Sequence, residues 1–193
     1  MVKVRSNIPG RLSKELSGLE GTIGIGTVTD PYQYAEKRFR LTQKCLVILK
    51  ERDLRIHLHT KSDLILRDIE LISSMKGEVG MTITTIVDKY SKITEPGAPL
   101  PEKRLGTLKR LCENGVDAYA LIGPVLNHLE GCEAEFVNAI ASTGVKRVYI
   151  DSLNSRPLLT ARLSRMNIRG SNTSKEKIRM LASDAGLHVR DVF

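Results

Sequence analysis

The sequence predicts an α/β fold built on a parallel sheet, and two observations carry this prediction. Strand-like segments begin near residues 22, 55, 79, 118 and 147, spaced by roughly thirty residues, the size of one βα unit. The segments between them place apolar side chains at helical spacing, and no hairpin turn joins two neighbouring strands. Such alternation is typical of a doubly wound sheet or of a (β/α) barrel.

The elements are expected in a regular order along the chain. The strands are predicted at Val2–Arg5, Thr22–Val28, Arg55–Thr60, Val79–Thr85, Ala118–Val125, Arg147–Ile150 and Leu187–Val192. The helices are predicted at Arg11–Leu19, Ala35–Arg52, Asp63–Met75, Glu102–Glu113, Glu133–Ser142 and from Thr173 to Ala185. The run Ala118–Val125 is almost continuously apolar, which indicates a strand buried on both faces.

Length and composition restrict the class of protein. A chain of 193 residues with 41% hydrophobic and 27% charged residues is typical of one soluble globular domain. The absence of Trp and the scarcity of Tyr and Phe argue against a binder of single strands that stacks bases on aromatic rings. No apolar run reaches the length of a membrane span, and the residues after Met1 do not resemble a signal sequence. We therefore expect a cytoplasmic protein without a membrane partner.

Positive charge is concentrated near the C-terminus. Residues 155–193 contain eight Lys and Arg residues against three acidic ones, which is +5 of the net charge of +8. We expect residues 1–154 to form the sheet-based part of the fold and residues 155–193 to form a basic helical extension packed on the same domain. The extension could bind nucleic-acid phosphates, although a solvated helix surface is the interpretation that we favour.

The three cysteines, Cys45, Cys112 and Cys132, are widely separated and do not have the spacing of a metal finger. Cys45 and Cys112 fall on apolar helical stripes, and Cys132 lies at an expected helix start. We interpret them as buried structural thiols rather than as disulfide partners or metal ligands.

Polar residues follow the predicted strands at the ends where parallel strands share one edge. The run Thr27–Glu36, TVTDPYQYAE, directly follows the first of these strands. Counted with the later strand ends, this edge would carry Thr29, Asp30, Tyr32, Gln33, Thr60, Lys61, Ser62, Thr82, Thr84, Thr85, Gly123, Pro124, Asn127, His128, Asp151, Ser152 and Asn154. These residues suit a polar small molecule with a carboxylate, an amine and a ribose, and they contain no obvious nucleophile–base pair.

His57 and His59 alternate with apolar residues, so both imidazoles should point to the same side of one strand. We favour interior histidines that are hydrogen-bonded. The alternative is a zinc site in a metal-dependent barrel hydrolase, because an H-x-H pair on a strand can ligate zinc.

The succession GTVTDPYQ, TKS, TITT, EPGAPLPEKRL and GPVLN resembles radical SAM proteins of the spore photoproduct lyase-like (DNA repair photolyase-like) group. The resemblance runs from about Val2 to Asn154. It implies a radical SAM TIM-barrel-like fold, here an incomplete (β/α) barrel with parallel strands, that binds S-adenosylmethionine beside a [4Fe–4S] cluster.

The resemblance also implies roles for particular residues. Thr29, Asp30 and Tyr32 correspond to the motif that contacts the methionine amino group. The other implied cofactor contacts are Lys61, Ser62, Thr82 and Thr84 on later strand ends, with Pro124 and Asn127 in a segment similar to the adenine-side motif. Glu95 and Arg104 belong to the EPGAP…R signature, where a structural ion pair is one interpretation.

The three-cysteine loop that holds the cluster in such enzymes does not occur in these 193 residues. We therefore expect no stable cluster in this chain and a truncated, inactive barrel. The complete reaction implied by the resemblance is reductive cleavage of S-adenosylmethionine to a 5′-deoxyadenosyl radical in a photoproduct-lyase-like process. An incomplete barrel would leave a strand edge near Val2–Arg5 or Thr22–Gly26 unpaired, so we expect homo-oligomers.

Overall fold

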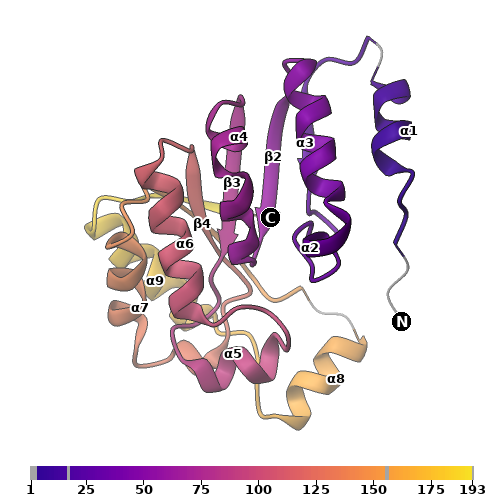
Figure 1. Ribbon diagram of the computed structural model, residues 1–193. Helices are drawn as coiled ribbons and strands as arrows, with labels where there is room; N and C mark the ends of the chain where they lie inside the picture. The colour runs from indigo at the N-terminus through magenta and orange to yellow at the C-terminus, as the bar shows by residue number, and fades with distance from the viewer. Residues whose placement is uncertain (1–3, 17, 155–156, 193) are drawn as a thin grey trace.

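The computed structural model describes residues 4–16, 18–154 and 157–192, and their strands form one open parallel sheet (Figure 1). The strands are β1 (Thr22–Ile25), β2 (Arg55–Thr60), β3 (Gly77–Thr82), β4 (Ala118–Ile122), β5 (Arg147–Asp151) and β6 (His188–Val192). They lie side by side in the order β1 to β6, and every neighbouring pair is parallel. The predicted α/β fold with an incomplete parallel barrel is confirmed.

The helices form a layer on one face of this sheet. They are α1 (Ile8–Glu15), α2 (Glu36–Phe39), α3 (Leu41–Glu51), the 3₁₀ helix η1 (Asp63–Asp68), α4 (Ile69–Ser73), α5 (Asp88–Thr94), α6 (Pro101–Glu113), the 3₁₀ helix η2 (Asn127–Leu129), α7 (Glu133–Ala141), α8 (Pro157–Arg165) and α9 (Asn172–Asp184). Figure 1 shows α3, α4 and α6 in front of the strands. Among the described residues, no helix combines the length and the apolar character needed to cross a membrane.

Burial along β2 shows how the sequence produces two different sheet faces. Ile56 and Leu58 are buried against the helices, whereas His57 and His59 alternate with them and point to the opposite face. We call this opposite side the open face. Four of the five residues of β4 are buried, and they include side chains on both faces of the sheet. This burial on both faces explains the almost continuously apolar sequence of the strand, as predicted.

Several predicted elements differ from the structure. The predicted strand Val2–Arg5 lies partly outside the described residues, and Val4 and Arg5 are not in a strand. The predicted helix Ala35–Arg52 is divided at Arg40, whose left-handed backbone (φ 51°) ends α2 and begins α3. The segment predicted as helix Asp63–Met75 begins as the 3₁₀ helix η1 rather than as an α-helix.

The sequence did not predict α5 or α8. Each is short and largely exposed: only Ser91 of α5 and Leu163 of α8 are buried. An amphipathic pattern with so few buried positions is a weak helix signal.

The C-terminal residues contribute to the same sheet. β6 pairs with β5, and α9 packs against α7 beside it. In the described part of the chain, β1 and β6 are each paired on one side, so both are edge strands. Self-association through an edge stays a prediction.

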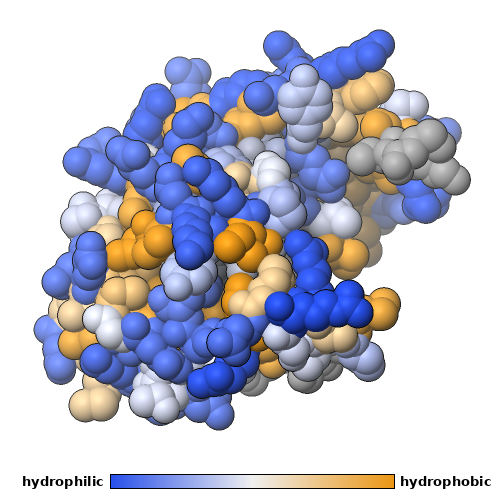
Figure 2. Space-filling model, turned by 90° about the horizontal axis from the view of Figure 1, so that it is seen from below, coloured by the Kyte–Doolittle hydropathy of each residue, from blue (hydrophilic) through white to orange (hydrophobic). Residues whose placement is uncertain are grey.

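Helices α2, α5 and α8 follow the carboxyl ends of β1, β3 and β5, and α5 and α8 lie at the lower end of the molecule in Figure 1. Figure 2 views the molecule from this end. Its surface is mostly hydrophilic, with apolar patches between the polar side chains. The carboxyl ends of the strands therefore open onto a polar surface, where open α/β sheets bind ligands.

Candidate functional site

The turn after β1 is fastened to the end of β2 by one carboxylate. Asp30 accepts hydrogen bonds from its own turn, at the Tyr32 backbone N–H (2.8 Å), and from β2, at the Thr60 hydroxyl (2.7 Å) and the Lys61 backbone N–H (2.7 Å). Both carboxylate oxygens are engaged in this way. Asp30 therefore fixes the position of the neighbouring side chains, including Thr29, relative to β2.

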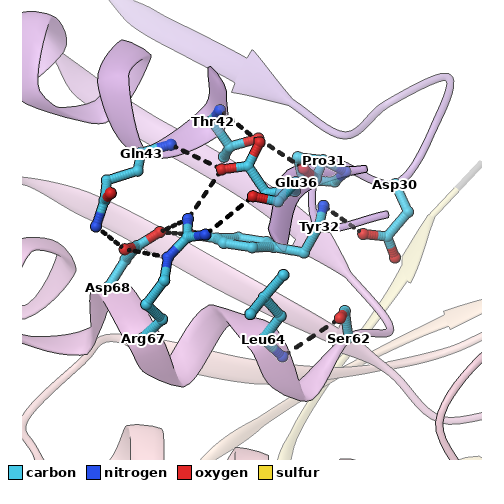
Figure 3. Close-up of polar contacts among 10 residues, drawn as sticks. All are labelled: Asp30, Pro31, Tyr32, Glu36, Thr42, Gln43, Ser62, Leu64, Arg67 and Asp68. Carbon is cyan, nitrogen blue, oxygen red and sulfur yellow. Dashed lines mark hydrogen bonds and ion pairs between the residues drawn. The ribbon is translucent and has the colours of Figure 1, made fainter. Parts of the chain in front are cut away.

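A buried polar network connects the same turn to the end of η1 (Figure 3). The Tyr32 side chain is only 2% exposed, and its hydroxyl donates to Asp68 (3.0 Å). Arg67 joins Asp68 (2.7 Å) to Glu36 (2.8 Å), and Gln43 donates to Asp68. Burial, and then the Asp68 charge, raise the pKa of Tyr32, so its phenol stays protonated and donates. The structure thus places the Tyr32 hydroxyl in the support of the turn.

A second network connects the ends of β2 and β3. Glu95 accepts from the Lys61 ammonium (2.9 Å), the Thr84 hydroxyl (2.8 Å) and the Arg104 guanidinium (2.6 Å). Arg104 is 1% exposed and also donates to the carbonyl of Pro99 (2.7 Å). The ion pair considered for Glu95 and Arg104 is confirmed. Through Glu95, it holds Lys61 and Thr84 at the edge of the site.

Acidification should weaken this second network. Burial acts to raise the pKa of Glu95, but the charges of Lys61 and Arg104 outweigh it, and the pKa lies below its ordinary value of 4.5. A carboxylate with a depressed folded-state pKa stabilises the fold above its unfolded pKa and loses that contribution as the pH falls through the folded value. We expect the stability difference between the natural chain and Glu95→Gln to be constant from about pH 7 to 5 and to shrink below about pH 4.5.

Urea unfolding across this pH range measures the difference. The exposed Glu102→Gln on α6 is the matched control and should show no such change. A Glu95→Gln difference that stays constant down to about pH 3 would contradict the expectation.

Two adjacent cavities lie beside these networks. One of about 640 Å³ is lined by Thr29, Asp30, Lys61 and Thr82, together with His57, His59, Gly123 and Asp151 among others. The other, of about 410 Å³, is lined by Asp30, Tyr32, Lys61 and Ser62 among others. Both volumes fall in the range of small-molecule sites, roughly 300–1,000 Å³. Asp30 and Lys61 line both cavities.

The remaining candidate residues lie elsewhere. Thr84 is engaged by Glu95, as described above. Asn127 accepts from the Arg169 backbone N–H (3.0 Å) and donates to the Asn167 carbonyl (3.2 Å), so it connects η2 to the segment before α9. Pro124 lies half-buried after β4 and lines neither cavity.

On the open face, His57 and His59 contact each other and the phenol of Tyr119. The prediction of hydrogen-bonded interior histidines is therefore confirmed. Tyr119 was not singled out from the sequence, because it lies inside the apolar run of β4. Its alternation with the buried Ala118 and Ala120 was the available signal.

The three cysteines are free and lie on separate helices: Cys45 in α3, Cys112 in α6 and Cys132 at the start of α7. Burial raises the pKa of each thiol, which is the opposite of what a thiolate ligand requires. Within the described ranges, no three His, Cys, Asp or Glu side chains are grouped around a metal position. The described residues therefore do not fit an iron–sulfur cluster.

Part of the C-terminal positive charge is used within the fold. Lys175 pairs with Asp191 (3.2 Å), Lys177 pairs with Glu133 (3.0 Å), and Arg179 pairs with Asp191. The residues Arg162, Arg165, Arg169 and Arg190 are exposed. Nucleic-acid binding by this segment stays a prediction.

Sequence comparison finds similar proteins without a described function. An uncharacterized protein of Methanocaldococcus jannaschii is 36% identical over 156 residues, which cover 79% of this chain and 58% of the relative. An uncharacterized protein of Mycobacterium tuberculosis is 28% identical over 165 residues, covering 80% and 48%. The chain thus spans about half the length of the curated relatives it matches. No protein-family model matches it.

Structure comparison defines the class of fold. Spore photoproduct lyase in complex with a dinucleoside spore photoproduct superposes with a TM-score of 0.70 at 12% identity, covering 99% of this chain and 68% of that one. SuiB of Streptococcus suis bound to S-adenosylmethionine superposes with a TM-score of 0.61 at 15% identity, covering 97% and 42%. The open parallel sheet therefore has the fold of the radical SAM partial barrels. Spore photoproduct lyase and SuiB are two of the solved proteins whose fold it resembles.

Proposed function

We propose that this chain forms the S-adenosylmethionine-binding part of a radical SAM enzyme with a photoproduct-lyase-like reaction. One observation carries the proposal: Thr29, Asp30, Lys61 and Thr82, which come from three different strand ends, line a single cavity of about 640 Å³. The similarity of the fold to a protein solved with S-adenosylmethionine supports the choice of ligand.

The residues present suit such a ligand. Hydroxyls and a carboxylate suit its amino group and ribose, and the Lys61 ammonium suits its carboxylate. When bound, S-adenosylmethionine supplies the 5′-deoxyadenosyl group that a complete radical SAM enzyme uses. The residues of this chain bind and orient it: Asp30 keeps the turn after β1 in place, and Glu95 keeps Lys61 directed to the cavity edge.

Because no cluster ligands are found among the described residues, we propose that this chain alone binds S-adenosylmethionine without cleaving it. Binding would then depend on the side chains of the strand ends, so we expect a dissociation constant of about 0.1–1 mM. Isothermal titration of the purified chain with S-adenosylmethionine measures it. Analysis of the ligand by chromatography after incubation with a reductant should show it intact.

A conservative substitution links the binding to the cavity. Thr29→Val keeps the size of the exposed side chain and removes its hydroxyl. We therefore expect the dissociation constant to rise about 5- to 10-fold, which corresponds to the net free-energy contribution of one hydrogen bond. Thr173→Val makes the same change on the exposed surface of α9 and should leave binding unchanged. The proposal would be overturned if the natural chain gave no heat of binding at millimolar ligand, or if both variants bound equally well.

A further inference from the structure

Two acidic residues, Asp30 and Asp151, line the cavity of about 640 Å³, and they differ in how the fold uses them. Both oxygens of Asp30 accept hydrogen bonds from the turn after β1 and from the end of β2. Asp151 is the last residue of β5. Among the described residues no cation pairs with its carboxylate, and the backbone N–H of the adjacent Ser152 is the donor that it meets. Asp151 therefore has lone pairs available to a ligand, whereas Asp30 holds the turn.

The register of the sheet places Asp151 on the open face. Tyr149 of β5 is paired with Leu121 of β4 and stacks on Tyr119, with 4.2 Å between the ring centroids. Side chains two residues apart on a strand point to the same face, so Asp151 shares this face with Tyr149. Its carboxylate therefore approaches the cavity from the strand opposite to the turn after β1.

A glycine makes room for this carboxylate. A Cβ atom at Gly123, which directly follows β4, would lie 2.6 Å from the Cβ of Asp151. Gly80 has a similar effect elsewhere on the open face, where a Cβ would lie 2.7 Å from the rings of both His59 and Tyr119. The Asp151 side chain thus occupies space that any other residue at position 123 would fill.

The surroundings of Asp151 leave its charge incompletely compensated. Burial raises the pKa of Asp151 above its ordinary value of 3.8, and the Ser152 backbone N–H and the charge of Lys175 offset this effect only in part. Lys175 itself pairs with Asp191 (3.2 Å). A partly desolvated carboxylate of this kind gains from each further hydrogen-bond donor that a ligand brings.

The position of Asp151 relative to Lys61 indicates which part of a ligand it meets. Lys61 follows β2, and β3 and β4 lie between β2 and β5, so the two residues are about 14 Å apart along the sheet. In S-adenosylmethionine the amino group and the carboxylate are bonded to the same carbon atom. A ligand whose carboxylate meets Lys61 therefore does not bring its amino group to Asp151. The ribose follows further along the molecule and presents two adjacent hydroxyls.

We propose that Asp151 binds the ribose hydroxyls of S-adenosylmethionine through its carboxylate oxygens, an inference that rests on the proposed function. A carboxylate only accepts hydrogen bonds, and its two oxygens match two neighbouring hydroxyl donors. An acidic side chain at a strand end recognises ribose hydroxyls in the same way in dinucleotide-binding sheets. Asp151 and Lys61 then fix the direction in which the ligand lies across the sheet.

Comparison of S-adenosylmethionine with an analogue that lacks both ribose hydroxyls tests the inference. Titration of the isotope-labelled chain, followed by nuclear magnetic resonance, gives dissociation constants into the millimolar range. We expect the natural chain to bind the analogue about 10-fold more weakly than S-adenosylmethionine. Asp151→Asn keeps one acceptor oxygen but removes the charge. It should raise the dissociation constant of S-adenosylmethionine about 10-fold and leave that of the analogue unchanged.

Matched variants separate the site from general effects. Asp184→Asn makes the same change at the exposed end of α9 and should leave both dissociation constants unchanged. Gly123→Ala should weaken the binding of S-adenosylmethionine because the new Cβ displaces Asp151, whereas Gly106→Ala in α6, where nothing lies within 4 Å, should not. Circular dichroism establishes that each variant is folded, and Asp151→Asn decides the question if Gly123→Ala does not fold.

The outcomes distinguish this inference from the proposed function. If the natural chain binds S-adenosylmethionine and Asp151→Asn binds it equally well, the inference is overturned and the proposed function stands. The inference is also overturned if Asp151→Asn weakens the binding of both compounds by the same factor, because the carboxylate would then act on the sulfonium charge rather than on the ribose. A natural chain that binds neither compound overturns the proposed function, and this inference with it.

Discussion

Replacing Arg104 by methionine is expected to lower the free energy of unfolding by about 3–5 kcal/mol, because it leaves the carboxylate of Glu95 buried without its closest cation. The guanidinium is 1% exposed and the Glu95 side chain 9% exposed. Methionine fills similar volume, so the loss reports the charge and its hydrogen bonds rather than a cavity. Urea unfolding at about pH 7, followed by circular dichroism, measures the change.

Lys103→Met is the matched control, since Lys103 precedes Arg104 in α6 and its side chain is 69% exposed. We expect this control to change stability by less than about 0.5 kcal/mol. Combining Arg104→Met with Glu95→Gln should cost less than the sum of the single changes, because the second removes the charge that the first leaves unpaired. Additive costs would show that the two side chains are not coupled.

The same ion pair explains why a structural residue matters for the candidate site. Glu95 contacts Arg104 with one oxygen and Lys61 with the other, at 2.6 and 2.9 Å. Because the buried Arg104 guanidinium fixes the Glu95 carboxylate, that carboxylate can hold the flexible Lys61 side chain in one position. Arg104 is therefore a positioning residue, which acts on the cavity through Glu95 and Lys61.

The strands could be predicted well because their signal is local. β2 has the predicted bounds, Arg55–Thr60, since alternate burial along one strand appears directly in the sequence. The division of the predicted helix at Arg40 could not be predicted in this way. A left-handed arginine has no compositional signal, because glycine or asparagine would be expected at such a position.

For the candidate site, the sequence predicted which strand ends meet but not how the side chains are used. Thr29, Asp30, Lys61 and Thr82 line one cavity because parallel strands bring their carboxyl ends together. The partner of Tyr32, Asp68, is 36 residues further along the chain, and no local pattern indicates this contact. The meeting of His59 with Tyr119 depends on the register of three strands and on Gly80, which a single sequence does not reveal.

Gly26→Ala is expected to lower the free energy of unfolding by about 2–5 kcal/mol, as the sum of backbone strain and collision. Gly26 directly follows β1 and begins the turn, with φ of +89°. A Cβ there would lie 2.2 Å from the carbonyl oxygen of His59, which belongs to the backbone of β2 and cannot rotate away. The turn that carries Thr29 and Asp30 would have to move away from β2, so weaker binding of S-adenosylmethionine should accompany the loss of stability.

Gly97→Ala separates the two causes. Gly97 has nearly the same backbone angle, φ +87°, but nothing lies within 4 Å of the position its Cβ would take. This variant should therefore show only the strain of a left-handed alanine, about 1–2 kcal/mol. Thermal and urea unfolding of both variants measure the difference, which reports the collision with the His59 carbonyl. Equal losses in the two variants would mean that the turn after β1 can shift freely, and that its close contact with β2 does not fix the geometry of the site.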